Sequence, residues 1–214
     1  MKAIIGPWLH LLWRIQVEGR KNVPRQGPVI LAANHQSFCD SFFLPLVVRR
    51  RRVTYVAKAE YFDSWKTAWF FRAAGQIPMN RSGGDASQRA LDTARGVLEG
   101  GDILAIYPEG TRAPDQGKLY RLHSRILVPL LEANPTVPVH AVATRYEKLP
   151  LGRIKVTAKI SPKLAIDSAV MTADEMVTTV RDALVQLGDL VYVNQYAFVA
   201  KARLQRQKDQ QLGS

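Results

Sequence analysis

The segment Asn34-His35-Gln36-Ser37-Phe38-Cys39-Asp40 brings an imidazole, a hydroxyl, a thiol and a carboxylate close together in the chain. His35 and Asp40 form the pair best suited to chemistry. A carboxylate beside an imidazole fixes its tautomer and raises its basicity, so the free ring nitrogen can take a proton from a hydroxyl. Because five residues are slightly more than one helical turn, the two side chains meet best where a loop enters a helix. The structural alternative is that Asp40 and Ser37 cap that helix.

Cys39 gives the same segment a second chemical interpretation. A thiol four residues from His35 is a candidate nucleophile. A buried structural cysteine is the commoner case, so we favour the pair of His35 and Asp40. Cys39 is also the single cysteine of the chain, which excludes an internal disulfide and fits a reducing compartment.

Two further segments carry residue types that bind an anion. In GQIPMNR, Arg81 follows a short strand and precedes SGGD, whose glycines allow close backbone approach. Arginine binds phosphate through two parallel hydrogen bonds, although a solvated surface arginine is the ordinary alternative. In YPEGTR, Gly110 lets the backbone run against a bound group, while Thr111 and Arg112 supply donors. These segments supply donors for an anion, but for Arg81 alone the surface alternative is favoured.

Glu109 is the unusual member of YPEGTR, because an isolated carboxylate repels phosphate. Two roles fit this residue. It can hold the arginines in place, or it can form a hydrogen bond with a hydroxyl of the ligand. The residue type alone leaves both roles open.

The elements that must position these residues alternate between strands and helices. This alternation predicts an α/β fold, with a mixed, largely parallel sheet flanked by helices. Such sheets bind ligands at the carboxyl ends of their strands, and NHQSFCD and YPEGTR each follow a buried strand. Expected strands are residues 14–18, 29–33, 52–58, 76–79, 102–108, 137–144 and 153–160. Expected helices are 2–13, 37–47, 64–74, 85–98, 121–133 (with a kink at Pro129) and 172–187, the last starting at a capping box of Thr172 and Glu175.

The basic residues are concentrated at the two ends of the 214-residue chain. The net charge of +12 divides into +9 for residues 1–81, zero for 82–200 and +3 for 201–214. This asymmetry indicates an anionic partner. The apolar content of 47% is ordinary for a globular protein, and we expect a single domain over residues 1–200. A polar and basic tail follows over 201–214, in which residues 205–214 are expected to be frayed.

Tryptophan placement favours a membrane surface as that partner. All four tryptophans lie in the basic first third, which also holds the Arg49–Arg52 run. Tryptophan beside Lys and Arg is typical of an interfacial element. The apolar stretch AIIGPWLHLLW would be about 16 Å long as a helix, too short for a bilayer core of about 30 Å. Residues 1–14 are therefore expected to form an interfacial helix, with Trp8 and Trp13 at headgroup depth.

Taken in chain order, N-H-x-S-x-x-D, G-x-I-x-x-x-R and [FY]-P-E-G-T-R resemble the motifs of the glycerolipid acyltransferases, closest to the lysophosphatidate (1-acylglycerol-3-phosphate) acyltransferases. The resemblance covers roughly residues 14–160. It implies transfer of a fatty acyl group from acyl-CoA or acyl carrier protein to the sn-2 hydroxyl of 1-acyl-glycerol-3-phosphate, giving phosphatidate. The segment 113–136 departs from the family pattern, because no F-K-x-G follows EGTR. We assign no site residues there.

The resemblance also implies roles for individual residues. His35 would act as the general base on the acceptor hydroxyl, and Asp40 would orient and charge-stabilise it. Attack on the thioester would be direct, and neither a metal nor a bound cofactor is expected. The phosphate and glycerol of the acceptor would be bound by Arg81, Glu109, Gly110, Thr111 and Arg112.

Two alternatives to this function remain open. The same chemistry can serve another acceptor, such as glycerol 3-phosphate, a different lysophospholipid or a glycolipid. A non-catalytic binder of an anionic membrane is the second alternative. Nucleic acid is not expected as a partner, because no nucleic-acid-binding motif accompanies the basic residues. We expect a peripheral or monotopic protein at the cytoplasmic face of the cell membrane, in contact with anionic lipid.

Overall fold

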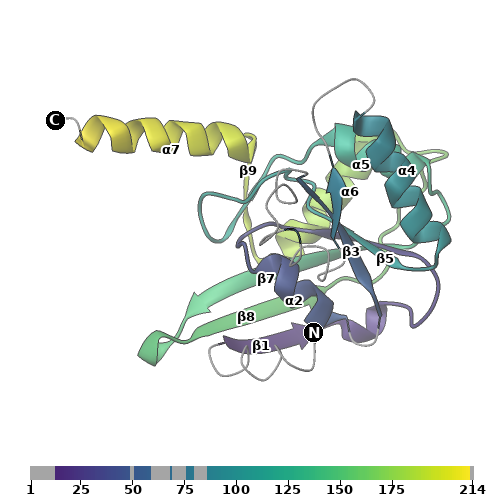
Figure 1. Cartoon of the computed structure of the whole chain (residues 1–214), viewed down its shortest axis with the longest axis horizontal. Coiled ribbons are helices and arrows are strands. Elements are labelled where there is room, and N and C mark those ends of the chain that lie inside the picture. The colour runs from purple at the N-terminus through teal and green to yellow at the C-terminus, as the bar shows by residue number, and fades with distance from the viewer. Residues whose placement is uncertain (1–12, 49–50, 59–67, 69–75, 80–85, 213–214) are drawn as a thin grey trace.

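The computed structural model describes residues 13–48, 51–58, 68, 76–79 and 86–212. Within these residues, one sheet has the strand order β1-β8-β7-β2-β5-β3-β4, and β6 pairs with β9 in a second sheet (Figure 1). Neighbouring strands run parallel except for the antiparallel pair β7 and β8. The strands are β1 (Trp13–Glu18), β2 (Val29–Ala33), β3 (Val53–Lys58), β4 (Gln76–Met79), β5 (Ile103–Ile106), β6 (Lys118–Tyr120), β7 (Val139–Lys148), β8 (Ile154–Ile160) and β9 (Val191–Val193).

Both faces of the large sheet are buried, because side chains of its central strands alternate between two apolar clusters. On β2, Ile30 and Ala32 face the first cluster and Leu31 faces the second. Residues of α4, α5 and α6 complete the first cluster, and residues of α2 complete the second. This two-sided burial explains why β2 is apolar throughout. The helices are α2 (Asp40–Val47), α4 (Ala86–Glu99), α5 (Ser124–Glu132), α6 (Ala173–Gly188) and α7 (Ala197–Leu212), with 3-10 turns at Arg20–Asn22 and Pro150–Gly152.

The α/β class and the mixed, largely parallel sheet are confirmed. The capping box is also confirmed: Thr172 Oγ1 accepts the amide of Glu175, and the Glu175 carboxylate accepts the amide of Thr172. Pro129 lies inside α5, which is shorter than expected and begins at Ser124. Among the described residues, NHQSFCD follows β2 and YPEGTR follows β5, as expected.

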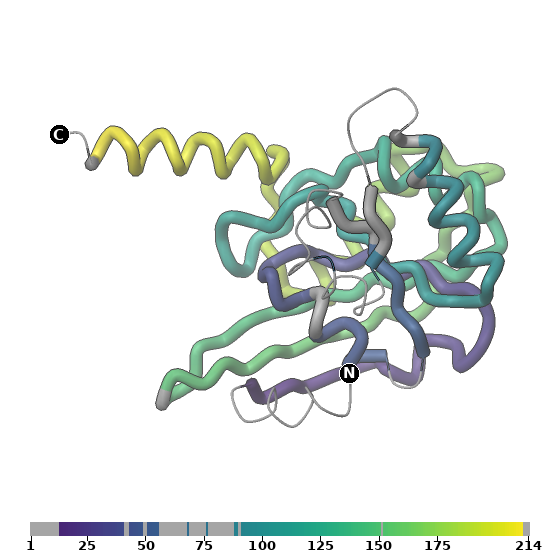
Figure 2. The backbone as a smooth tube through the Cα atoms, viewed as in Figure 1, coloured from purple at the N-terminus to yellow at the C-terminus, as the bar shows by residue number. Residues whose placement is uncertain are grey.

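Two expectations about local structure were wrong. Trp13 belongs to β1, not to the end of an N-terminal helix, because it pairs with Ile154 of β8, whereas the strand expected over residues 14–18 is confirmed. The Trp13 ring packs edge-on against Phe43, with ring centroids 5.6 Å apart. The segment expected to fray from residue 205 is instead helical to residue 212 as part of α7, which leads away from the rest of the chain (Figure 2). The short strands β6 and β9 were not expected.

Several expectations fall outside the described residues. These are the interfacial helix before Trp13, the helix over residues 64–74, and the position of Arg81. Arg51 belongs to the expected basic run, and its guanidinium donates to the carbonyl oxygens of Pro24, Gly27 and Gly101. This arginine therefore ties the loop before β3 to the loop that contains Pro24 and Gly27 and to the turn at Gly101. No helix among the described residues combines the length and the apolar character needed to cross a bilayer.

Candidate active site

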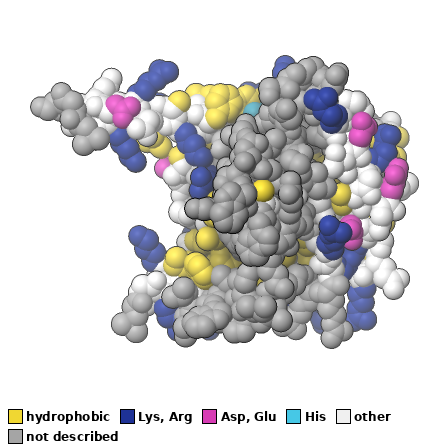
Figure 3. All heavy atoms as spheres, viewed as in Figure 1, with side chains coloured by type: hydrophobic (Ala, Val, Ile, Leu, Met, Phe, Trp, Pro, Cys, Tyr) yellow, Lys and Arg dark blue, Asp and Glu magenta, His cyan; other side chains and the backbone are white. Residues whose placement is uncertain are grey.

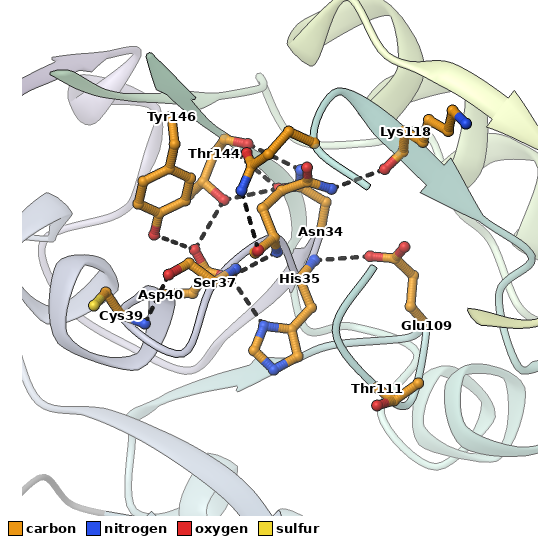
Figure 4. Close-up of polar contacts among 12 residues, drawn as sticks. Asn34, His35, Ser37, Cys39, Asp40, Glu109, Thr111, Lys118, Thr144 and Tyr146 are labelled. Atoms are coloured by element: carbon orange, nitrogen blue, oxygen red, sulfur yellow. Dashed lines mark hydrogen bonds and ion pairs between the residues drawn. The ribbon is translucent and has the colours of Figure 1, made fainter. Parts of the chain in front are cut away.

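His35 and Asp40 are in direct contact at the carboxyl end of β2. His35 Nδ1 lies 2.9 Å from Asp40 Oδ2. Asp40 is fully buried, whereas the His35 side chain is 18% exposed. The loop after β2 supplies His35, and Asp40 begins α2, as the five-residue spacing predicts. The sequence-based expectation that this pair meets where a loop enters a helix is confirmed (Figure 4).

Asp40 is held by donors on both of its carboxylate oxygens. Besides the imidazole, Oδ2 accepts the backbone amides of Gln36 and Ser37, each at 2.8 Å. Oδ1 accepts the hydroxyls of Thr144, at 3.3 Å, and of Tyr146. Hydrogen bonds to both oxygens offset the cost of burying this side chain. The carboxylate beside His35 is therefore fixed in place.

This arrangement determines which imidazole nitrogen is free to act. The contact with the Asp40 carboxylate places the ring proton on Nδ1, which leaves the lone pair on Nε2. Further support comes from Tyr107, whose ring stacks on the imidazole with centroids 4.2 Å apart and planes 17° apart. His35 is thus held in one orientation, and its free Nε2 belongs to the part of the side chain that reaches solvent. Such a group can accept a proton from a hydroxyl.

The loop that carries His35 is tied to the sheet through Asn34. The Asn34 side chain accepts the backbone amide of Thr144 at 2.7 Å and donates to the Thr144 carbonyl at 3.0 Å. These bonds continue the parallel pairing of β2 with β7 beyond Ala33. Because Thr144 also contacts Asp40, one residue of β7 positions both the loop and the acid. Asn34, Thr144 and Tyr146 were not identified from the sequence.

Glu109 has a structural role that the sequence did not predict. Its carboxylate is fully buried, and its two oxygens accept the backbone amides of His35, at 2.7 Å, and of Tyr120, at 3.0 Å. Glu109 therefore joins the loop after β5 to the loop after β2 and to β6. It fixes the backbone of His35 as a brace, and its expected contact with substrate stays a prediction.

The other residues of YPEGTR lie beside this brace. Gly110 has a φ of 71°, and a Cβ on it would lie 2.9 Å from Cδ2 of His123, so only glycine fits there. Thr111 is half-buried and Arg112 is exposed. Since β2 and β5 are parallel neighbours, Thr111 and Arg112 follow at the same sheet edge as His35. The structure thus brings the first and third motifs together, while Arg81 lies outside the described residues.

Ser37 and Cys39 have structural contacts in the same loop. The Ser37 hydroxyl accepts the amide of Cys39 at 3.1 Å, and α2 begins after Cys39. The expected N-cap role of Ser37 was wrong, because the helix starts three residues later than expected. Among the described residues, no three His, Cys, Asp or Glu side chains are grouped to hold a metal ion.

A pH-dependent stability is expected from Glu109. Burial raises its pKa from 4.5 to about 7, against the lowering effect of the amides of His35 and Tyr120. Between pH 4.5 and about 7 the native state therefore retains a proton on Glu109 that the unfolded chain has released. The contribution of Glu109 to the free energy of unfolding is therefore complete below pH 4.5 and is lost as the pH rises through 7. This difference in pKa corresponds to roughly 3 kcal/mol.

Glu109→Gln tests this dependence. The free energies of unfolding of the native chain and the variant are measured in urea between about pH 4.5 and pH 8. We expect the native chain to lose roughly 3 kcal/mol more than the variant across this range. The variant should also be less stable at the acidic end, because its amide nitrogen must face a backbone N–H. Parallel pH profiles for the two chains would contradict the assigned protonation of Glu109.

The fold and the site together define an α/β domain in which a buried carboxylate contacts a partly exposed imidazole at the sheet edge. The chain belongs to the Acyltransferase family, whose match covers residues 14–144. It is similar in structure to the 1-acyl-sn-glycerophosphate (LPA) acyltransferase PlsC from Thermotoga maritima. The TM-score is 0.64 at 28% identity, over 84% of this chain and 72% of that one.

Curated relatives include proteins with different lipid acceptors in their names. The chain is 32% identical to a lyso-ornithine lipid O-acyltransferase from Pseudomonas aeruginosa, over 65% of this chain and 51% of the relative. It is 25% identical to a 1-acyl-sn-glycerol-3-phosphate acyltransferase from Bacillus subtilis, over 61% of this chain and 63% of the relative. The chain thus spans between half and two thirds of the length of these two relatives. The resemblance noted in the sequence is confirmed at the level of the family.

Proposed function

We propose that this protein transfers a fatty acyl group from an acyl thioester to the sn-2 hydroxyl of 1-acylglycerol-3-phosphate, giving phosphatidate. The observation that carries the proposal is the buried Asp40 carboxylate bound to His35 Nδ1, which leaves Nε2 as an accessible base. The sheet edge that carries His35 also carries Thr111 and Arg112, whose donors suit the phosphate of the acceptor. Acyl-CoA or acyl carrier protein serves as the co-substrate.

The proposed reaction needs no covalent intermediate on the protein. His35 Nε2 takes the proton of the acceptor hydroxyl as its oxygen attacks the thioester carbonyl carbon. Asp40 stabilises the imidazolium that forms. When the tetrahedral intermediate collapses, the C–S bond breaks and the new ester forms. The imidazolium then returns its proton to the thiolate, so the products are a neutral thiol and the acylated lipid.

A lyso-ornithine lipid is the second candidate acceptor. The relative from Pseudomonas aeruginosa, at 32% identity, carries this acceptor in its name. The hydroxyl chemistry at His35 is the same for both acceptors, so the preference for one acceptor depends on how the protein binds its headgroup. A glycerol 3-phosphate acceptor and other lysolipids are further outcomes of the same test.

An acceptor panel tests the proposed function. The native chain is mixed with one acyl-CoA and, in parallel, with lysophosphatidate, lyso-ornithine lipid, other lysophospholipids or glycerol 3-phosphate. Thiol release is followed, and the acylated product is identified by mass. The proposal expects the highest kcat/KM with lysophosphatidate. Preference for lyso-ornithine lipid would replace the acceptor and keep the mechanism, and no thiol release above the lipid-free rate would favour a non-catalytic membrane binder.

Cys39→Ala distinguishes direct attack from a covalent acyl-cysteine. In the proposed mechanism the thiol takes no part, so the variant should retain its kcat within about twofold. Thiol release and lipid product are measured together for the variant and the native chain. Loss of turnover by a variant with an unchanged thermal midpoint would overturn direct attack.

The membrane is the proposed source of the lipid acceptor. The basic first third of the sequence supports contact with an anionic surface. Trp13, which is partly buried and packs against Phe43, belongs to this basic first third. We place the protein at the cytoplasmic face of the membrane as a peripheral or monotopic protein, which is a proposal that salt-dependent binding to anionic vesicles would test.

A further inference from the structure

The start of α7 lies against the YPEGTR loop, although the two are far apart in the sequence. Lys201 Nζ donates to Thr111 Oγ1 over 3.2 Å. Lys201 is half-buried, unlike the exposed cationic residues that follow it on the same helix. None of the three sequence motifs includes this residue. Its contact adds a cation from the C-terminal helix to the loop that carries Thr111 and Arg112.

The position of Lys201 is fixed by packing of the preceding segment. The Tyr196 ring stacks on His123, with centroids 4.4 Å apart and planes 13° apart. Ala197 and Ala200 are buried in a small apolar cluster with Ala113 and Tyr120, which places the first turn of α7 on the domain. Figure 3 shows hydrophobic side chains and a histidine where this helix meets the domain, with Lys and Arg side chains further along it. The first turn is therefore held in place while the remainder of α7 is exposed.

The charges around Lys201 favour a bound anion at the same loop. The ammonium lies close enough to lower the pKa of Glu109, which burial raises more strongly. Both oxygens of Glu109 accept backbone amides, so the backbone holds this carboxylate in place. A lysine ammonium carries three donors and acts as a compact point charge. Beside the Thr111 hydroxyl it can donate to a phosphate oxygen of a ligand that reaches this loop.

We propose that Lys201 is a headgroup-binding residue, which holds the phosphate of the acceptor against Thr111 and Arg112. The inference rests on the proposed function, because it assumes a phosphate-bearing acceptor at this loop. It assigns α7 a role in acceptor recognition, whereas the three motifs end at Arg112. A purely structural role, in which Lys201 only ties α7 to Thr111, is the alternative to be tested.

Equilibrium binding without an acyl donor tests this assignment separately from the chemistry. Micelle-free lysophosphatidate and monoacylglycerol of the same chain length are titrated into the native chain and into Lys201→Gln. Glutamine keeps a hydrogen-bond donor on a slightly shorter side chain but lacks the positive charge. The variant should bind lysophosphatidate about tenfold more weakly, as expected for loss of one charge-assisted hydrogen bond. Its affinity for monoacylglycerol should be unchanged.

Two matched variants complete the experiment. Lys201→Arg keeps the charge and should retain lysophosphatidate binding within about threefold. Arg203→Gln removes the same charge from an exposed position on the same helix and should change binding less than about twofold. Equal weakening by Lys201→Gln and Arg203→Gln, or equal weakening for both lipids, would overturn the assignment. If the native chain binds lysophosphatidate as expected but produces no phosphatidate, the proposed function fails while the assignment of Lys201 stands.

Discussion

Replacing His35 with alanine is expected to reduce kcat about 10³-fold. Among the described residues of the site, the imidazole is the group that combines a fixed carboxylate on Nδ1 with a free Nε2. A positioned general base contributes about 10²–10⁴-fold to a rate. The variant keeps the proposed headgroup donors of Thr111 and Arg112, so the KM for the acceptor should change less than kcat. Thiol release and lipid product, measured over a range of acceptor concentrations, separate the two parameters.

His35→Asn is the matched control for this prediction. Asparagine can donate its amide N–H to Asp40, as the imidazole does, but it offers no base. If His35 acts as the base, the asparagine variant should be as slow as the alanine variant while its thermal midpoint stays closer to that of the native chain. Recovery of most of the native rate by asparagine would show that His35 only supports the loop, and the proposed mechanism would be wrong.

The location of the site was predictable because short-range sequence features determine it. An apolar run such as Val29–Ala33 followed by NHQSFCD indicates a buried strand with polar residues at its carboxyl end. The same argument placed Glu109 to Arg112 after the strand Ile103–Ile106. The adjacency of these two strands in the sheet was not available from the sequence, and it is this adjacency that brings the two loops together.

The supporting residues were missed because their contacts span long sequence separations. Thr144 and Tyr146 reach Asp40 from β7, 104 and 106 residues further along the chain. Neither belongs to a motif, and a tyrosine on an alternating strand is an ordinary core residue by composition. The two residues point to the same side of the sheet because the side-chain period of a strand is two. That fact becomes useful only once β7 is known to lie beside β2.

Glu109 and Lys201 illustrate a second reason, which is that burial is a property of the folded chain. In the sequence, Glu109 looked like a ligand-binding acid in a loop. In the fold it is buried, and both of its oxygens accept hydrogen bonds from backbone amides. Lys201 looked like one charge of a basic tail. Packing of Tyr196 on His123 brings the start of α7 to the domain and turns this lysine into a neighbour of Thr111.

Asp40→Asn is expected to reduce kcat about 10²-fold or more while the protein remains folded. An imidazolium that forms during proton transfer would lose its neighbouring negative charge, so the transition state would be less well stabilised. The backbone amides of Gln36 and Ser37 can only donate, so the asparagine side-chain oxygen must occupy the position of Asp40 Oδ2, where it accepts both amides. The amide nitrogen would then face hydroxyl groups. Rates are measured with saturating acyl-CoA and lysophosphatidate, and stability by thermal unfolding.

The hydroxyls explain why this substitution separates charge from structure. Burial and the Asp40 carboxylate raise the pKa of Tyr146, so its hydroxyl stays protonated and donates to Asp40 in the native chain. In the Asp40→Asn variant the hydroxyls of Tyr146 and Thr144 can rotate and accept the amide protons, which preserves the hydrogen bonds. Asp40→Ala has no such compensation and should lose both rate and at least about 2 kcal/mol of stability, because buried donors remain unpaired. If Asp40→Asn were as unstable as Asp40→Ala, or as active as the native chain, the buried charge would not be what supports the base.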